Sequence, residues 1–341
     1  MDSIFNATPS DRPPAENALA SKPRVVLSYR RFQPKINHDI FVIGGKGKDM
    51  KPTNSVEMFS SKEGRWVDIA PMSIPRSSAS SVVFDAQVIV SGGCTDTVDD
   101  KSRCTDSIEI LNLGKCPLKW NMSDAKLPIP LSGHQTFIYM GKLIVVCTFN
   151  IQEKNERGGN ITRKVCKIFQ VSLSAPYAAK ELHTLPTPVT QYKAELANEK
   201  VFLFGGSDGD CKRVLIYDLG INEYRDMPGL PIFRHNMSVV RWGGKIILVG
   251  GIEKVVRDCC WVDQTCDYAT MYDMETGESV MLPTMKYPRK GCSAVVTDDV
   301  IVVIGGHYNS VEFYDFHTNI WGAFKVMKET KFETTAVVSP L

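Results

Sequence analysis

The sequence predicts an all-β fold in which six four-stranded sheets form a ring, a six-bladed β-propeller. An apolar run ending in paired glycines recurs about every 50 residues, each repeat splits into four strand-sized pieces, and no helical periodicity intervenes. A four-stranded meander cannot bury both of its faces alone. Stacking the sheets around an axis lets each cover its neighbour and leaves only short edges exposed.

The paired glycines mark the end of the second strand in each repeat. They are Gly44-Gly45, Gly92-Gly93, Gly205-Gly206, Gly250-Gly251 and Gly305-Gly306. The interval between the second and third pairs is about twice too long, and halfway through it an apolar run ends in Cys147-Thr148. Counting this run gives six repeats. We expect the glycines to allow a close approach of another backbone segment.

The remaining strands of each repeat follow the same order. A first strand such as 80–84 and a short turn precede the apolar second strand. The third strand is expected to carry a large apolar residue and then a polar residue that fixes the next turn. These pairs are Phe59-Ser60, Leu111-Asn112, Phe169-Gln170, Tyr217-Asp218, Tyr272-Asp273 and Tyr314-Asp315. Fourth strands bring large aromatic residues, expected to fill the wedge between blades, at Trp66, Trp120, Tyr224 and Trp321.

The two ends of the repeat region predict how the ring closes. One strand-like segment, 333–339, remains after Trp321, whereas the first glycine-paired strand, 39–45, lacks a well-spaced predecessor. We therefore expect the C-terminal strand to complete the first blade, in which the four strands are antiparallel.

The sequence before the first repeat predicts a leader rather than a further domain. Residues 1–23 lack the basic start and apolar run of a signal peptide, so we expect a flexible leader. The propeller is expected to span residues 24–341. The strand-like segment 24–30 is followed by a turn longer than those of the other repeats, which leaves the placement of residues 24–38 open.

Composition excludes several classes of function. A net charge of +2 and the lack of a basic run with interleaved aromatics predict no nucleic-acid binding. No apolar stretch approaches the roughly 18 residues of a membrane helix. Without a secretion signal, the ten cysteines are expected to be thiols of a cytoplasmic protein. The role of Cys259, Cys260 and Cys266 stays open, with a cysteine-bearing loop favoured over a zinc site because no second paired-ligand motif lies nearby.

The repeat resembles the kelch motif. The resemblance lies in the double glycine, the strands Ser-Val-Glu-Met-Phe and Ser-Val-Glu-Phe-Tyr-Asp, the spaced tryptophan, and the Pro-Arg at 75–76 and 288–289. It covers residues 39–341 and is most similar to the kelch propellers of BTB-kelch proteins. The third repeat departs from the pattern, because Cys147-Thr148 replaces a glycine pair and a clear tryptophan is missing.

This resemblance implies a protein-interaction role. BTB-kelch relatives present a target protein to a Cullin-3 ubiquitin ligase. The segment before residue 39 is too short for the BTB and BACK domains that hold the cullin, so we expect any link to Cullin-3 to run through another chain. A standalone scaffold or an actin-binding kelch protein is the alternative. Whether the chain is a standalone kelch protein or a fragment or shortened product of a BTB-kelch gene stays open.

Connections on one face of the ring are the predicted binding site. Second-to-third and fourth-to-first connections share a face, and five of the six fourth-to-first connections bring Arg or Lys while the sixth brings His. We expect these cations to be exposed, to bind an acidic or phosphorylated peptide and to be replaceable at little cost in stability. The predicted partner-binding residues are Arg76, Ser77, His134, Tyr192, Lys193, Arg234, His235, Asn236, Arg289, Lys290 and Lys331. Trp261, in the long connection 252–268, is an additional anchor; the other long connection is 149–163.

Catalysis is the competing class. Related propellers carry copper, as in galactose oxidase, or bind iron, or isomerise sugars, and such sites need converging His, Tyr and carboxylate ligands. The chain has six histidines, of which His134, His235 and His307 are expected on the binding face, but no carboxylate partner is fixed by spacing. The iron-ligand pattern Glu-x-x-x-Asp-x-x-x-His is absent. We therefore expect no catalytic residue, no metal and no cofactor.

Overall fold

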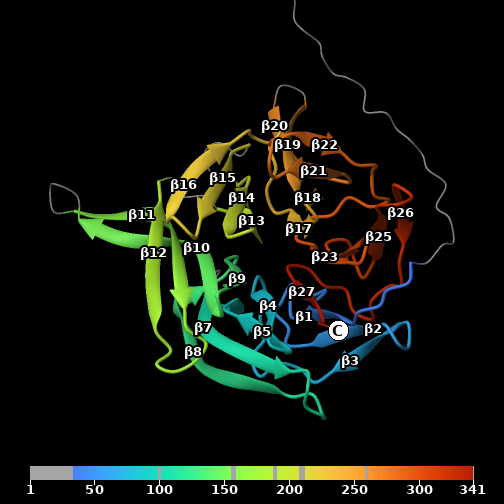
Figure 1. The fold of residues 1–341 in the computed structure, drawn as a ribbon, viewed down its shortest axis with the longest axis horizontal. Coiled ribbons are helices and arrows are strands. Elements are labelled where there is room, and N and C mark those ends of the chain that lie inside the picture. The colour runs from blue at the N-terminus through green and yellow to red at the C-terminus, as the bar shows by residue number, and fades with distance from the viewer. Residues whose placement is uncertain are drawn as a thin grey trace, which may run out of the picture.

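Six four-stranded antiparallel sheets surround a central axis (Figure 1). The computed structural model describes residues 34–98, 101–154, 159–186, 190–206, 212–257 and 260–340. The predicted six-bladed propeller is confirmed. The predicted leader, residues 1–23, and residues 24–33 lie outside the described residues.

Every blade has the same strand order from the axis outward, which is the predicted order of first to fourth strand. Blade 1 consists of β27 (Thr335–Val338), β1 (Ile40–Ile43), β2 (Val56–Ser60) and β3 (Arg65–Ile69). Blade 2 consists of β4 (Ser80–Phe84), β5 (Gln87–Ser91), β7 (Lys101–Asn112) and β8 (Trp120–Leu131), with β6 (Cys94–Val98) paired to the beginning of β7. Blade 3 consists of β9 (Gln135–Tyr139), β10 (Lys142–Lys154), β11 (Asn160–Val171) and β12 (Ala179–Leu185).

The second half of the ring repeats the arrangement. Blade 4 consists of β13 (Lys193–Ala197), β14 (Lys200–Phe204), β15 (Val214–Asp218) and β16 (Glu223–Met227). Blade 5 consists of β17 (Ser238–Trp242), β18 (Lys245–Val249), β21 (Ala269–Asp273) and β22 (Ser279–Met281), with the separate hairpin β19 (Ile252–Arg257) and β20 (Cys260–Thr265). Blade 6 consists of β23 (Ser293–Thr297), β24 (Val300–Ile304), β25 (Val311–Asp315) and β26 (Ile320–Ala323).

Six hydrophobic cores lie between blades rather than within them. Ile40 and Val42 of β1 pack with Val302 and Ile304 of blade 6, whereas the alternate residues of β1 pack toward blade 2. The other four clusters fill the remaining seams in the same way. Because both faces of each second strand are covered, these strands are apolar without alternation.

The paired glycines make room for the backbone that enters the next blade. Gly44 has φ +58°, and a Cβ there would lie 2.4 Å from the carbonyl oxygen of Arg76. The N–H of Gly45 donates a hydrogen bond to that same oxygen at 2.7 Å. Gly250 and Gly251 meet the carbonyl of Arg289 in the same way. The expected close backbone approach is confirmed, and any side chain at these positions would be strained.

Three of the four predicted wedge aromatics occupy the seams. The indole N–H groups of Trp66, Trp120 and Trp321 donate to backbone carbonyls that follow the fourth strand of the preceding blade, and all three rings are buried. Tyr224 also faces the preceding blade, with its ring 5.5 Å from that of His183 on β12, but it is 41% exposed and so does not fill the wedge as predicted. Its strand, β16, is largely exposed.

The third blade corrects the predicted register. In the other blades the large third-strand residue pairs with the residue four positions before the first glycine, as Tyr314 does with Ile301. In blade 3 the equivalent pair is Leu143 with Val171, so the predicted position at Phe169 is wrong by two residues. Without a glycine pair the strands do not stop at Cys147, and β10 and β11 continue as a hairpin that projects from the ring (Figure 1).

The C-terminal strand completes blade 1, as predicted. Strand β27 pairs with β1 in an antiparallel ladder from Ile40 with Val338 to Ile43 with Thr335. Val337 packs in the seam between blades 1 and 2. The first and last strands of the ring are thus joined in one sheet, so the two ends of the repeat region hold each other in place.

Deletion of residues 332–341 should abolish cooperative folding. It removes the innermost strand of blade 1 and exposes the edge of β1 together with the apolar residues of two seams. Thermal unfolding followed by circular dichroism should show a melting temperature lowered by well over 10 °C or no cooperative transition. The control lacks only residues 340–341, beyond β27. An unchanged melting temperature in the longer deletion would refute closure by this strand.

Candidate functional site at the channel mouth

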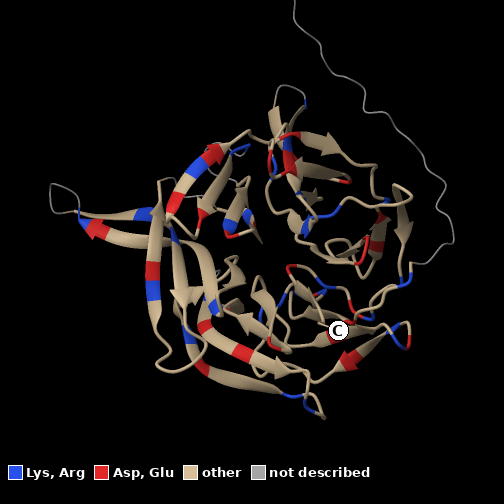
Figure 2. Ribbon diagram, in the orientation of Figure 1, with Lys and Arg blue, Asp and Glu red and all other residues tan. Residues whose placement is uncertain are grey.

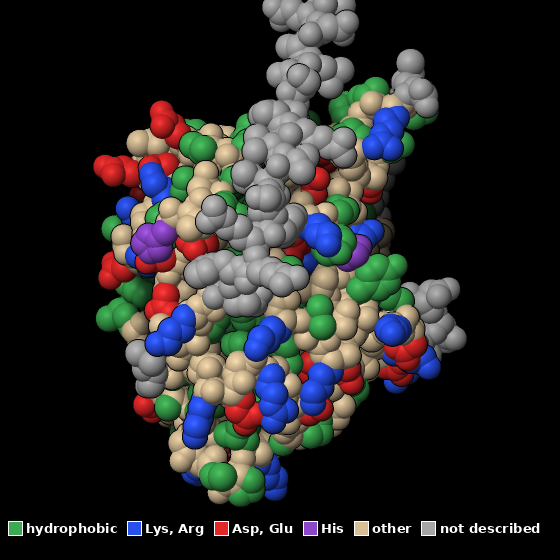
Figure 3. Space-filling model, turned by 90° about the vertical axis from the view of Figure 1, so that its right-hand side faces the viewer, with side chains coloured by type: hydrophobic (Ala, Val, Ile, Leu, Met, Phe, Trp, Pro, Cys, Tyr) green, Lys and Arg blue, Asp and Glu red, His purple; other side chains and the backbone are tan. Residues whose placement is uncertain are grey.

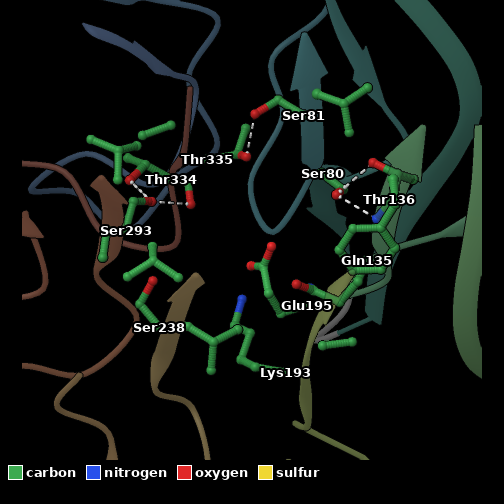
Figure 4. Close-up of a pocket in the computed structure, with 18 of the residues that line it drawn as sticks. Ser80, Ser81, Gln135, Thr136, Lys193, Glu195, Ser238, Ser293, Thr334 and Thr335 are labelled. Atoms are coloured by element: carbon green, nitrogen blue, oxygen red, sulfur yellow. Dashed lines mark hydrogen bonds between the residues drawn. The ribbon is translucent and has the colours of Figure 1, made fainter. Parts of the chain in front are cut away.

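The first strands of all six blades line a central channel. The channel encloses a cavity of about 390 Å³, and residues of β4, β9, β13, β17, β23 and β27 form its wall. Ser80, Thr136, Ser293 and Thr334 point hydroxyl groups toward neighbouring first strands and are hydrogen-bonded there (Figure 4). The wall is therefore polar and mostly neutral.

A ring of backbone hydrogen bonds surrounds one mouth of this channel. It is built from one residue per blade, each with positive φ and each two positions before a first strand: Ser78, Gly133, Gln191, Asn236, Gly291 and Glu333. The N–H of one residue donates to the carbonyl of its counterpart in the preceding blade at five of the six seams, for example from Gly291 to Asn236 at 3.1 Å. The predicted fourth-to-first connections do therefore meet on one face.

The expectation that the cations of these connections are exposed is wrong for Arg76. Its side chain is fully buried and its guanidinium donates to the carbonyl oxygens of Gly92 and Ser107 and to the Glu109 carboxylate. Desolvation lowers the pKa of Arg76, and the charge of Glu109 opposes that shift. A partner docking on the surface does not reach this side chain.

Arg289, Arg234 and Lys331 are buried in the equivalent places. Arg289 donates to the Gly305 carbonyl and pairs with Glu312 at 2.8 Å. Arg234 donates to the Leu248 carbonyl and to Thr270, and its guanidinium lies over the ring of Tyr268. The Lys331 ammonium lies 3.8 Å from Glu57. These four of the six predicted Arg and Lys residues hold their own blades together, so the expectation that they can be replaced with little loss of stability is wrong.

The acidic partners of these cations were missed in the sequence. Glu57, Glu109 and Glu312 are buried, and their carboxylates also accept backbone N–H groups of the incoming connection, such as that of Lys286. The signal was present, because Glu follows an aliphatic residue in the third strand of each of these three blades. Each Glu lies on the third strand, two residues before the large apolar residue that the repeat pattern singled out. Assigning this segment to a strand does not by itself reveal which cation the carboxylate pairs with.

The remaining predicted residues divide into buried and accessible groups. Ser77, His134, Tyr192 and His235 are buried, and the His134 imidazole lies 3.0 Å from the Ser91 hydroxyl. Lys193 and Asn236 line the mouth. The accessible residues Lys193, Asn236, Lys290 and Trp261 stay candidates for partner contact.

Lys193 breaks the symmetry of the channel. As the first residue of β13 it occupies the position held in the other blades by neutral residues: Ser80, Gln135, Ser238, Ser293 and Thr335. Its ammonium makes no hydrogen bond or ion pair with the residues that the structure describes, and desolvation lowers its pKa. The acidic residue at the mouth, Glu333, is already paired with Lys46 at 3.0 Å.

Glu195 breaks the symmetry two residues further along β13. The equivalent residues of the other blades are Val82, Phe137, Val240, Val295 and Val337, which pack toward the next blade. Desolvation in this position raises the pKa of Glu195 to about 8, although Arg241 acts in the opposite direction. Figure 4 shows Lys193 and Glu195 both reaching into the channel region.

Two long hairpins and a shorter one rise from second-to-third connections. The predicted long connection 252–268 is the β19–β20 hairpin, where Trp261 is 66% exposed and pairs across the strands with Val256, 59% exposed. The predicted connection 149–163 is the extension of β10 and β11, and the hairpin β6–β7 in blade 2 was not predicted. Trp261 is therefore accessible to a partner, as its interpretation as an anchor requires.

Charge elsewhere on the molecule is mixed. Along the ribbon, Lys and Arg alternate with Asp and Glu on the outer strands, and the strands around the axis carry few charges (Figure 2). The side of the ring seen in Figure 3 shows both signs interspersed. No single sign of charge dominates that side of the ring.

The described residues contain no group of three or more His, Cys, Asp and Glu side chains arranged to hold a metal ion. His134 contacts Ser91, whereas His307 stacks on Tyr287 with ring centroids 4.5 Å apart. Cys259 lies outside the described residues. Cys260 is exposed and Cys266 is buried.

Replacing one member of the buried pair Arg289–Glu312 should destabilise the fold strongly. Arg289→Met or Glu312→Leu leaves a buried charge without its partner, which costs about 3–5 kcal/mol. The double variant should lose less than the sum of the singles. Urea unfolding measures these values, and changing the exposed pair Glu63–Arg65 should cost less than about 1 kcal/mol. Single variants no more costly than that surface control would contradict the structural role.

Glu195→Gln should stabilise the fold in a pH-dependent way. The unfolded chain loses the Glu195 proton near pH ~4.3, whereas the folded chain keeps it until about pH 8. The contribution of the Glu195 carboxyl to wild-type stability therefore falls as the pH rises between those two values, and it stays constant above the higher one. The melting-temperature advantage of the variant should grow through that window. Glu223→Gln, at an exposed position, is the control, and an advantage independent of pH would argue against the buried carboxyl.

Comparisons with known proteins agree with the repeat analysis. The Kelch motif model matches residues 35–73 and 288–321. Human Kelch-like protein 38 is 21% identical over 299 residues, covering 83% of this chain and 46% of the relative. Kelch-like protein 15 of Danio rerio is 23% identical over 296 residues, covering 84% and 41%. Kelch-like protein 40 of Mus musculus is 41% identical over 58 residues, covering 17% and 9%.

The chain spans less than half the length of these curated relatives. Among solved structures, that of YjhT superposes with a TM-score of 0.60 at 14% identity, covering 78% of this chain and 88% of YjhT, which supports the fold alone. No helix among the described residues is long and apolar enough to cross a membrane. The chain thus carries kelch motifs at residues 35–73 and 288–321, and its propeller is similar to those of the kelch-like proteins.

Proposed function

We propose that this propeller is a non-catalytic protein-interaction module that binds an acidic or phosphorylated peptide at the channel mouth. The observation that carries the proposal is Lys193, whose ammonium lines both the mouth and the channel without an ion-pair partner among the described residues. Leaving a partly desolvated charge unpaired is unfavourable. A carboxylate or phosphate from a ligand would form a charge-assisted hydrogen bond there.

The surroundings of Lys193 suit a peptide. The mouth also presents the side chains of Gln191 and Asn236, and exposed Lys290 lies in the neighbouring connection. Trp261 stands on a hairpin on the same face, and exposed tryptophans are common anchors of protein interfaces. The amides would bond peptide backbone while the cation selects the acidic group.

The partner system is also a proposal. We propose that the propeller recognises targets for a Cullin-3 ubiquitin ligase through another chain, as suggested by its similarity to kelch-like proteins. Capture of the tagged chain from cytoplasmic extract, followed by mass spectrometry, should recover a cullin together with a target protein. Recovery of actin without cullin would favour the alternative of an actin-binding scaffold. Stoichiometric copper or iron in purified protein would favour an enzyme and overturn the non-catalytic assignment.

Lys193→Met should weaken binding of acidic peptides at least about tenfold. The measurement is an array of acidic and phosphorylated peptides beside their neutral counterparts, probed with purified wild-type and variant chains. Lys180→Met, on the exposed outer strand β12, removes the same charge away from the mouth and should bind as the wild type does. Thermal unfolding checks that both variants fold, which we expect because Lys193 has no hydrogen-bond or ion-pair partner to lose among the described residues.

Equal binding by Lys193→Met and the wild type would move the site to the hairpins or the opposite face. Loss of binding in Trp261→Ala alone would then identify the β19–β20 hairpin as the recognition element. Binding of neutral and acidic peptides with the same affinity would reject the acidic ligand class.

A further inference from the structure

We propose that Cys94 and Cys104 form a reversible disulfide, a redox modification site beside the channel mouth that is independent of the proposed binding function. The two residues are directly opposite each other on strands β6 and β7. Their sulfur atoms are 3.7 Å apart. This is the contact distance of two thiols on adjacent strands, so the residues are already placed for bond formation.

The backbone around Cys94 places the two side chains close together. The N–H and the carbonyl of Cys94 both bond to Ser77, at 2.8 and 2.9 Å, and so face away from β7. Cys94 and Cys104 are therefore a non-hydrogen-bonded pair, in which Cα atoms are about 4.5 Å apart and side chains approach most closely. That separation lies within the range of disulfides, about 4.4–6.8 Å. Rotation of the side chains can form the bond with little backbone movement.

A second pair of neighbouring cysteines shows what this geometry requires. Cys147 is opposite Lys167, and Cys166 is opposite Thr148, so the two cysteines are offset by one residue. Such an offset places side chains on opposite faces of a sheet. Cys147 and Cys166 accordingly belong to different hydrophobic cores, and both are buried. Of the cysteines that the structure describes, only the 94–104 pair combines facing sulfur atoms with partial exposure.

A small disulfide such as oxidised glutathione can drive the reaction. The Cys94 thiolate attacks one sulfur of the reagent, breaking its S–S bond and forming a mixed disulfide with release of one glutathione thiolate. The Cys104 sulfur then attacks the Cys94 sulfur, forming the internal bond and releasing the second glutathione. The two protons lost by the cysteines appear on the two glutathione thiols, and the reagent is reduced by two electrons. Excess reduced glutathione reverses both steps.

The environment favours Cys94 as the first nucleophile. The hydrogen bond with Cys94 and then burial raise the pKa of Cys104, so its thiol loses its proton less readily and acts second, when the departing glutathione thiolate takes up that proton. Both residues are partly exposed, which allows a small reagent to reach them. Thiolates rather than thiols attack disulfides.

The bond would fix one side of the channel mouth. Cys94 is hydrogen-bonded on both backbone groups to Ser77, the neighbour of the mouth residue Ser78. Oxidation ties the base of the β6–β7 hairpin to the strand that runs back into blade 2. Backbone amides of residues 94–98 and 101–105 should therefore exchange with solvent more slowly in the oxidised chain.

The test uses the purified full chain equilibrated in glutathione buffers from fully reduced to fully oxidised. After the remaining thiols are blocked by alkylation, peptide mass spectrometry should find the Cys94 and Cys104 peptides linked, with a loss of about two mass units relative to the two free thiols. The linked peptide should disappear in reducing buffer. In Cys94→Ser and Cys104→Ser, the remaining cysteine should carry glutathione instead. Cys116→Ser, at an exposed cysteine, is the matched control and should form the link as the wild type does.

The wild-type measurement decides the proposal without depending on the variants. Glutathione attached separately to Cys94 and Cys104 in oxidising buffer, with no linked peptide, would overturn it. A link from either cysteine to a different cysteine would overturn it as well. Hydrogen exchange on the oxidised wild type gives a second readout, and unchanged exchange across the hairpin would reject the mechanical role at the mouth.

Discussion

The ring depends on the close approach between a paired glycine and the backbone carbonyl that enters the next blade. The carbonyl of Arg76 bonds to the N–H of Gly45 in blade 1, while the guanidinium of Arg76 bonds to Gly92 and Glu109 in blade 2. One residue therefore joins two neighbouring sheets, by its backbone on one side and its side chain on the other. Arg234, Arg289 and Lys331 do the same at three other seams. The glycines are needed because a side chain would stand where that carbonyl lies.

In blade 3 the incoming cation, the first glycine of the pair and the buried glutamate are all replaced together. Its incoming residue is Leu131, whose carbonyl still accepts the Gly93 N–H at 2.7 Å, but whose side chain is apolar. Cys147 stands in place of the glycine, and Phe169 takes the position of the buried glutamate. All three side chains pack in one hydrophobic core. An apolar set has replaced the ion pair, which is consistent with the general finding that well-packed apolar residues can substitute for buried charges.

The sequence predicted the architecture well because the evidence for it was repetition. Six repeats defined the strand order, and the surplus C-terminal strand defined the closure. The register in blade 3 was wrong because Phe169 was chosen for its aromatic ring, while the ladder places Val171 there. The prediction that the cations are exposed was wrong for a related reason. A repeat pattern gives the positions of Arg76 and Glu109 along the chain but not their contact across the blade, and only the register of β5 with β7 brings the carboxylate to the incoming connection.

Because most cations of the fourth-to-first connections are buried, one part of the mouth differs from another only where residues depart from the sixfold pattern. Five first strands begin with Ser, Gln or Thr, and such groups can bond many ligands without selecting for charge. Lys193 and Glu195 break this pattern on a single strand, and each retains a desolvated group that the repeat itself does not require. The hairpins on blades 2, 3 and 5 break the pattern a second time, in second-to-third connections. A ligand bound at the mouth would thus meet Lys193 on one side and the Glu333–Lys46 ion pair on another, and this asymmetry would give the ligand a defined orientation around a nearly sixfold axis.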